Sequence, residues 1–213
     1  MDLGYKLERG IYLVSPSKIE NIKEFVSDLK FIFKRFKIIC FQLRLKNITE
    51  FELIECINIL KPICIKYNVN FILNDLPQIA AKYACDGLHF GKEDGSLQEI
   101  MPKFQGIIGV SCYNEVERAL QFAGSGVSYV SFGAFFKTKT KENTVECSIS
   151  VLEKFVSLKP NFPVCVIGGI SSLNAKPLVE AGASLVALSS AIWDLKKNND
   201  KALELEKLSL IFN

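Results

Sequence analysis

The segment Ile11-Tyr12-Leu13-Val14-Ser15-Pro16-Ser17 decides between two folds. Its first four residues form a short run of β-forming apolar residues, which predicts a strand buried on both faces. An open doubly wound sheet that binds a nucleotide needs a glycine-rich turn directly after its first strand, and Ser15-Pro16-Ser17 contains no glycine. The segment therefore favours the other fold in which strands and helices alternate, a closed (β/α)8 barrel.

Further runs of the same kind recur along the chain, and segments with helical periodicity separate them. In one such segment Ile54, Ile57 and Leu60 lie on one helical face, and Thr49 with Glu52 has the form of a capping box that begins this helix. Strands are expected at Ile11–Val14, Ile38–Leu43, Asn70–Leu73, Gly87–Phe90, Ile107–Val110, Tyr129–Phe132, Val164–Ile167 and Leu185–Leu188. Eight strand–helix units in 213 residues predict one α/β domain over residues 1–213, a single (β/α)8 TIM barrel without large insertions.

The composition is that of a folded, soluble protein and excludes several other classes. Hydrophobic residues make up 49% and charged residues 23%, and the net charge of +3 is too balanced for nucleic-acid binding. The N-terminus has no signal-peptide pattern, and the most apolar region, Phe31 to Leu45, is interrupted by Lys34, Arg35 and Lys37. The seven cysteines form no CxxC pair and are expected to be reduced thiols. We expect a cytoplasmic protein with no membrane partner, and the sequence leaves open whether it is a monomer or a homo-oligomer.

Polar residues should follow the strands, because the active sites of these barrels lie at the carboxyl ends of the strands. After the second expected strand, Gln42-Leu43-Arg44-Leu45-Lys46 alternates so that Gln42, Arg44 and Lys46 share one face. Two neighbouring cations pointing into a barrel are costly unless an anion lies between them. The sequence therefore predicts an anion site here, with a solvated strand end as the alternative.

Carboxylates follow the next two strands. Asp75 comes after Asn74, and Asp94 lies in the loop after His89 and Phe90. Two aspartates at neighbouring strand ends can bind one Mg²⁺, which usually takes one or two carboxylates and completes its shell with substrate phosphates. Each aspartate alone is also typical of a turn or a helix cap. His89, the only histidine, is interpreted either as a proton-transfer group or as a strand-end residue held by its neighbours.

Phosphate-binding features follow the last four strands. Ser111 offers a hydroxyl after the fifth strand, and the sixth is followed by a loop in which Thr138 and Thr140 alternate with lysines up to Lys141. This loop is either a set of phosphate donors or a solvated surface loop. The pairs Gly168-Gly169 and Ser189-Ser190 follow the seventh and eighth strands, whose loops form the recurring phosphate site of these barrels. The sequence thus predicts two anion pockets, one of which has a metal ion.

Taken in order, these motifs resemble the thiamine-phosphate synthase family over nearly the whole chain. The T-x-T-K motif combined with N-D and Q-x-R-x-K is the specific part of the resemblance. The motifs are Gln42-x-Arg44-x-Lys46, Asn74-Asp75, Asp86-Gly87-x-His89-x-Gly91-x-x-Asp94, Ile108-Gly109-x-Ser111, Gly133-x-x-Phe136-x-Thr138-x-Thr140-Lys141, Ile167-Gly168-Gly169-Ile170 and Ser190-Ala191-Ile192.

The resemblance implies a reaction and a role for each motif. The expected substrates are hydroxymethylpyrimidine diphosphate and a thiazole phosphate, which are joined after diphosphate leaves and a pyrimidine methylene cation forms. Asp75 and Asp94 are expected to hold Mg²⁺ on the diphosphate, and Gln42 to orient the substrates. The implied diphosphate-binding residues are Arg44, Lys46, Asn74, Ser111 and Lys141, of which all but Asn74 are expected to be catalytic. The implied thiazole phosphate residues are Thr138, Thr140, Gly168, Gly169, Ser189 and Ser190.

Three positions depart from the pattern that is frequent in the family. Leu76 stands where many members have Arg or Asp, Ala134 where many have Pro, and Lys137 where Pro or a small residue is frequent. A related thiazole tautomerase has a histidine at the position of Ala134, so its proton-transfer chemistry is disfavoured here. A catalytically silent regulator that binds a phosphate is a further alternative, which the retained carboxylates and cations disfavour.

Overall fold

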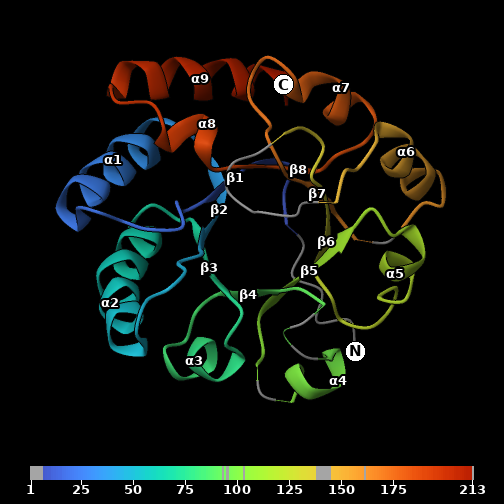
Figure 1. Cartoon of the computed structure of the whole chain (residues 1–213), viewed down its shortest axis with the longest axis horizontal. Coiled ribbons are helices and arrows are strands. Elements are labelled where there is room, and N and C mark those ends of the chain that lie inside the picture. The colour runs from blue at the N-terminus through green and yellow to red at the C-terminus, as the bar shows by residue number, and fades with distance from the viewer. Residues whose placement is uncertain are drawn as a thin grey trace.

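The structure is a closed barrel of parallel strands surrounded by helices (Figure 1). The computed structural model describes residues 7–92, 94, 96–102, 104–137, 145–160 and 162–212. In these ranges eight strands pair in chain order, and β8 closes the barrel by pairing with β1. The strands are β1 (Gly10–Val14), β2 (Ile38–Leu43), β3 (Asn70–Asn74), β4 (Gly87–Phe90), β5 (Ile107–Tyr113), β6 (Tyr129–Phe132), β7 (Val164–Val166) and β8 (Leu185–Leu188). The predicted (β/α)8 TIM barrel is confirmed, with strand ends that differ from the expected ones by up to three residues.

Helices follow each strand and cover the outside of the barrel. They are α1 (Ile22–Arg35), α2 (Glu50–Lys66), α3 (Pro77–Lys82), α4 (Leu97–Ile100), α5 (Val116–Leu120), α6 (Ile149–Ser157), α7 (Ala175–Glu180), α8 (Ser190–Trp193) and α9 (Asn198–Ile211). The predicted capping box is confirmed: Thr49 accepts from the N–H of Glu52, whose carboxylate accepts from the N–H of Thr49. None of the helices in the described ranges is long and apolar enough to cross a membrane.

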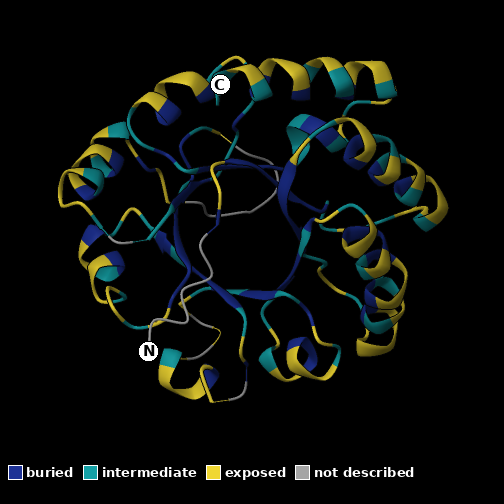
Figure 2. Cartoon of the chain, turned by 180° about the vertical axis from the view of Figure 1, so that it is seen from behind, coloured by how far each residue is buried: buried dark blue, intermediate teal, exposed yellow. Residues whose placement is uncertain are grey.

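Strand residues alternate between two separate apolar layers. In β1, Ile11 and Leu13 belong to the layer between strands and helices, whereas Tyr12 and Val14 belong to a second cluster inside the barrel. The same alternation holds in β8, where Leu185 and Ala187 belong to the interior cluster and Val186 and Leu188 to the outer layer, because successive side chains of a strand point to opposite faces. Figure 2 shows the consequence, with buried residues along the barrel wall and exposed residues on the outer faces of the helices.

The last helix, α9, closes the outer ring and is fastened by a buried ion pair. It lies against α1, α7 and α8 (Figure 1). Lys201 of α9 is 4% exposed, and its ammonium contacts the carboxylate of Asp28 in α1. Removing one partner of such a pair leaves a buried charge without compensation, which is costly. The end of the chain is thereby attached to its first helix.

Candidate active site

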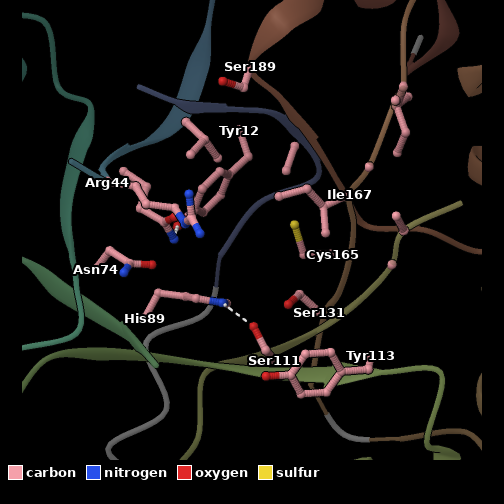
Figure 3. A pocket seen from close by; sticks show the side chains of 18 of the residues that line it. Tyr12, Arg44, Asn74, His89, Ser111, Tyr113, Ser131, Cys165, Ile167 and Ser189 are labelled. Atoms are coloured by element: carbon pink, nitrogen blue, oxygen red, sulfur yellow. Dashed lines mark hydrogen bonds between the residues drawn. The ribbon is translucent and has the colours of Figure 1, made fainter. Parts of the chain in front are cut away.

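A pocket opens at the carboxyl ends of the strands and continues into the barrel interior (Figure 3). Residues from every strand or from the loop after it line the pocket, as expected for a site in this fold. Eight of the predicted site residues are brought together in its wall: Gln42, Arg44, Asn74, Ser111, Gly168, Gly169, Ser189 and Ser190. The lining also includes apolar side chains, among them Val14, Cys165, Ile167 and Ala187.

Other predicted residues lie outside the wall of this pocket. The alternation through Gln42, Arg44 and Lys46 was expected to put all three on one strand face, and this is wrong for Lys46. Strand β2 ends at Leu43, and Arg44, the next residue, still lines the pocket. Lys46 is exposed farther along the following loop, where its backbone N–H donates to the carbonyl of Ser17. Thr138, Thr140 and Lys141 lie outside the described residues.

The two aspartates lie in loops that follow paired strands. Asn74 of β3 is in register with His89 of β4, and the next N–H, that of Asp75, donates to the carbonyl of His89 at 2.8 Å. Asp75 Oδ2 accepts from Asn74 Nδ2 at 2.5 Å. In the loop after β4, Asp94 Oδ2 accepts from the N–H of Gly91 at 2.7 Å. The carboxylates therefore belong to adjacent loops at the same end of the barrel, beside the pocket wall.

This donor set fits a hard cation that shares its ligands with a substrate. Mg²⁺ prefers oxygen ligands and is commonly held by one or two carboxylates together with phosphate oxygens. Within the described ranges, no group of three or more His, Cys, Asp and Glu side chains comes together as a metal site. A metal ion held by Asp75 and Asp94 would complete its shell with other oxygens, such as those of water or of a substrate phosphate.

Inside the barrel, five polar side chains form one chain of hydrogen bonds. Gln42 Nε2 donates to Tyr12 Oη at 3.0 Å, and Tyr12 Oη lies 2.8 Å from Tyr129 Oη. His89 connects this end to the pocket: its Nδ1 lies 2.9 Å from Tyr129 Oη, and its Nε2 lies 2.9 Å from Ser111 Oγ. Figure 3 draws the contact between His89 and Ser111. The interpretation of His89 as a residue held by its neighbours therefore agrees with its two contacts.

Burial keeps these interior groups uncharged near neutral pH. The pKa of His89 is lowered to about 4, chiefly by burial and also by the nearby positive charge of Arg44, and Asp94 partly opposes the change. Burial also raises the pKa of Tyr12 and Tyr129 well above the ordinary value. At neutral pH, His89 is therefore a neutral imidazole, and both tyrosines keep their protons.

The glycines after β7 allow two loops of the chain to pack closely. Gly168 and Gly169 have φ of +103° and +63°, conformations that L-residues rarely adopt. A Cβ on Gly168 would lie 2.3 Å from the Cβ of Ala134, and one on Gly169 would lie 2.5 Å from the carbonyl oxygen of Lys137. Their missing side chains make room for the loop after β6, and their backbone lines the pocket.

Backbone N–H groups at this end of the pocket are available for an anion. Among the described residues, no acceptor is found for the N–H groups of Gly168, Gly169 and Ser190. The hydroxyl of Ser189 is engaged, since its Oγ donates to the carbonyl of Ser15 at 3.2 Å. Helix α8 has only four residues, so we expect its dipole to contribute little here.

The whole-chain comparison decides the family. Residues 11–192 match the family model described as "Thiamine monophosphate synthase". The chain belongs to the thiamine monophosphate synthase family. A thiamine-phosphate synthase from Pelagibacter ubique is 38% identical over 191 residues, which cover 89% of this chain and 91% of the relative. Another from Nitrosospira multiformis is 37% identical over 169 residues, or 78% and 72% of the two chains.

A solved structure agrees with the family assignment. Thiamine phosphate pyrophosphorylase from Pyrococcus furiosus superposes with a TM-score of 0.79 at 26% identity, and the match covers 95% of each chain. The relatives named thiamine-phosphate synthase are transferases, so this member of the thiamine monophosphate synthase family is an enzyme of that class.

Several pocket residues of this family member were not predicted from the sequence. Tyr12 and Tyr129 were interpreted only as apolar strand positions, yet their hydroxyls meet inside the barrel. Tyr113 enters the pocket wall where the pairing of β5 with β6 shifts register, and its φ is +55°. Ser15 is not in the pocket wall but supports a residue that is: its Oγ accepts from the N–H of Arg44 at 2.9 Å, whereas the sequence used Ser15 only to exclude a glycine-rich turn. An apolar pattern that includes tyrosines or serines at inward-facing positions is the one available signal for such residues.

Proposed function

We propose that this protein is a thiamine-phosphate synthase. It joins 4-amino-2-methyl-5-hydroxymethylpyrimidine diphosphate to 4-methyl-5-(2-phosphoethyl)thiazole, and the products are thiamine phosphate and diphosphate. The observation that carries the proposal is a single pocket with a polar group at each end and an apolar wall between them. In Figure 3, Ser189 lies apart from Asn74, His89 and Ser111, with Cys165 and Ile167 along one side. Such a pocket suits two ligands that each carry a phosphate group and meet through apolar rings.

The diphosphate group belongs at the end formed by the loops after β2 to β5. Arg44, Asn74 and Ser111 line this end and offer a cation, an amide and a hydroxyl. Asp75 and Asp94 would hold Mg²⁺ beside them, and a bound Mg²⁺ would supply Lewis-acid stabilisation of the charge on the leaving diphosphate. Lys46 and Lys141 remain proposed contributors of positive charge from the loops after β2 and β6.

The thiazole phosphate belongs at the opposite end, against the loops after β7 and β8. The N–H groups of Gly168, Gly169 and Ser190, which have no acceptor among the described residues, provide donors for its oxygens. Thr138 and Thr140 are proposed to complete this end from the loop after β6. This arrangement leaves the thiazole ring directed toward the apolar middle of the pocket.

The proposed reaction is a dissociative substitution that needs little proton transfer. The bond between the pyrimidine methylene carbon and the diphosphate oxygen breaks, and the oxygen keeps the electron pair. The thiazole nitrogen then donates its lone pair to the methylene cation and forms the new carbon–nitrogen bond. The interior groups agree with this chemistry, because the pKa of His89 is lowered to about 4 and those of both tyrosines are raised. None of these three groups is tuned to act as a base near neutral pH.

The position after the β6 glycine separates this proposal from tautomerisation of the thiazole. Ala134 lines the pocket at this position and carries no titratable group. A tautomerase needs an acid or base at the ring atoms. The geometry therefore favours the synthase proposal over a tautomerase.

A product assay tests the proposal directly. The purified protein is incubated with both substrates and Mg²⁺, and thiamine phosphate and diphosphate are quantified together. We expect equimolar products only when both substrates are present. Arg44→Gln should reduce the rate strongly, whereas Arg35→Gln is the matched control, because Arg35 is exposed at the end of α1 and lies outside the pocket wall. Isomerised thiazole without coupled product, or no turnover at all, contradicts the proposal.

A further inference from the structure

The interior hydrogen bonds join side chains from five strands into an unbranched series. In order they are Gln42 of β2, Tyr12 of β1, Tyr129 of β6, His89 of β4 and Ser111 of β5. The four contacts span 2.8 to 3.0 Å, which is normal hydrogen-bond geometry. Gln42 and Ser111 form its ends, and both line the pocket.

The direction of each hydrogen bond follows from counting protons. Gln42 Nε2 can only donate, so Tyr12 Oη accepts the hydrogen bond between them. The hydroxyl proton of Tyr12 then has one acceptor among the described contacts, Tyr129 Oη. Tyr129 must then donate to Nδ1 of His89. This places the imidazole proton on Nε2, which donates to Ser111 Oγ. The hydroxyl proton of Ser111 is left to point into the pocket.

The opposite orientation of the Gln42 amide would reverse every bond in the series. If the amide oxygen faced Tyr12, the hydroxyl of Tyr12 would donate to it, and Tyr129 would donate to Tyr12. His89 would then carry its proton on Nδ1, and Ser111 would donate to Nε2. In that state Ser111 could offer the pocket only an acceptor, which repels an anion.

A glycine on β5 leaves the space that the central residue of the series, Tyr129, fills. A Cβ on Gly109 would lie 2.1 Å from Cζ and 2.3 Å from Oη of Tyr129, so the phenol ring occupies the space that a side chain would take. The ring also stacks on His89 with centroids 5.6 Å apart and an interplanar angle of 26°. The phenol of Tyr129 therefore has little freedom to leave His89.

We propose that this series is a polarity relay in which the amide of Gln42 sets the tautomer of His89 and makes Ser111 a hydrogen-bond donor to the pocket. Tyr12, Tyr129 and His89 are positioning residues, because they act through Ser111. The relay rests on the proposed function in one respect only, the group that accepts the hydrogen bond from Ser111, which is an oxygen of the leaving diphosphate. A hydrogen bond from Ser111 to that oxygen strengthens as negative charge develops during bond cleavage.

The tautomer of His89 is the direct test, and the chain suits it because His89 is the only histidine. Its ring nitrogens can be observed by ¹⁵N NMR of histidine-labelled protein without assignment variants. At about pH 8, where an ordinary imidazole is neutral, we expect a protonated Nε2 and an unprotonated Nδ1. A protonated Nδ1 in the wild type overturns the proposal. This readout needs no substrate, so it is independent of whether the protein makes thiamine phosphate.

Two tyrosine variants form a matched pair. Tyr129→Phe removes the donor to Nδ1 of His89, so both tautomers should appear. In Tyr12→Phe, the hydroxyl of Tyr129 keeps one acceptor among the contacts described, which is Nδ1 of His89. The imidazole proton of His89 should therefore stay on Nε2, as in the wild type. If Tyr129→Phe leaves the tautomer unchanged, the relay is wrong. The kcat of Tyr129→Phe should fall roughly tenfold, since a hydrogen bond to a charged group changes a rate by about one to two factors of ten. The KM of this variant for the pyrimidine diphosphate should stay close to that of the wild type.

Gln42→Glu separates a relay from a packing role. The ionised carboxylate is an acceptor only, so Tyr12 must then donate to it and the whole series should reverse. Because Gln42 is 4% exposed and burial raises the pKa of a carboxyl group, the tautomer is followed from about pH 8 to about pH 10. We expect His89 to carry its proton on Nδ1, the opposite of the wild type. A folded variant that kept the wild-type tautomer up to about pH 10, where the buried carboxyl is ionised, would refute the relay. If this variant does not fold, the tautomer of His89 in the wild type and in Tyr129→Phe still tests the relay.

Discussion

Gly168→Ala should destabilise the protein because its new methyl group has no space. The Cβ would lie 2.3 Å from the Cβ of Ala134 and 2.5 Å from its Cα, so backbone as well as side chain must move. Overpacking of this kind costs about 1–3 kcal/mol. The φ of +103° adds strain of about 1 kcal/mol for an L-residue. We therefore expect the free energy of unfolding to fall by about 2–4 kcal/mol.

Gly124→Ala is the matched control. Gly124 also has a positive φ, +71°, but nothing lies within 4 Å of the position of its Cβ. This variant should lose only the backbone strain of about 1 kcal/mol. Urea unfolding of both variants separates the steric cost from the strain. Equal losses of stability in the two variants would refute the packing argument.

Two further measurements connect this packing to binding. Ala134→Gly in the Gly168→Ala background removes the methyl contact but not the contact with the Cα, so it should restore only part of the lost stability. The KM for the thiazole phosphate should rise in Gly168→Ala, because the displaced loop carries the proposed phosphate donors. The KM for the pyrimidine diphosphate should stay unchanged, since Arg44 follows β2 and Asn74 ends β3, so neither belongs to the displaced loop. A parallel rise of both values would indicate general damage to the barrel instead.

Three other changes should have distinct effects. Asp75→Asn and Asp94→Asn should each lower kcat at fixed Mg²⁺ by about a hundredfold, since Lewis-acid stabilisation is worth several kcal/mol, and an unchanged Mg²⁺ titration of activity would contradict the metal role. The pKa of His89 is about 4 in the folded protein, against an ordinary value of 6.5. The contribution of His89 to the free energy of unfolding should therefore be complete above pH 6.5, and about 3 kcal/mol should be lost as the pH falls toward 4. Urea unfolding in chelator should show this loss in the wild type and not in His89→Gln, which has no histidine. Lys201→Met should cost about 3–5 kcal/mol in the same assay by leaving Asp28 without its partner, and adding Asp28→Leu should recover most of it.

The strands were predictable because both of their faces are buried. Short apolar runs such as Ile38–Leu43 carry this information locally, and the structure places a strand on the same residues. The polar residues after the runs were predictable for the same reason, because the carboxyl ends of parallel strands meet at one end of a barrel. Arg44, Asn74 and Ser111 thus reach one pocket wall, whereas Lys46 does not, because the local pattern did not reveal that β2 ends at Leu43.

The sequence by itself determined the barrel, the family motifs and the end of the barrel that carries the site. Only the tertiary structure decided which inward-facing residues meet. Tyr12 and Tyr129 are 117 positions apart, and their hydroxyls come within 2.8 Å because closing the barrel brings β1 and β6 to opposite sides of one interior. The room for Tyr129 depends likewise on Gly109 of the neighbouring strand. Periodicity reports the face on which a side chain lies, but a contact across the interior depends on closure, register and the volume of residues far away in the chain.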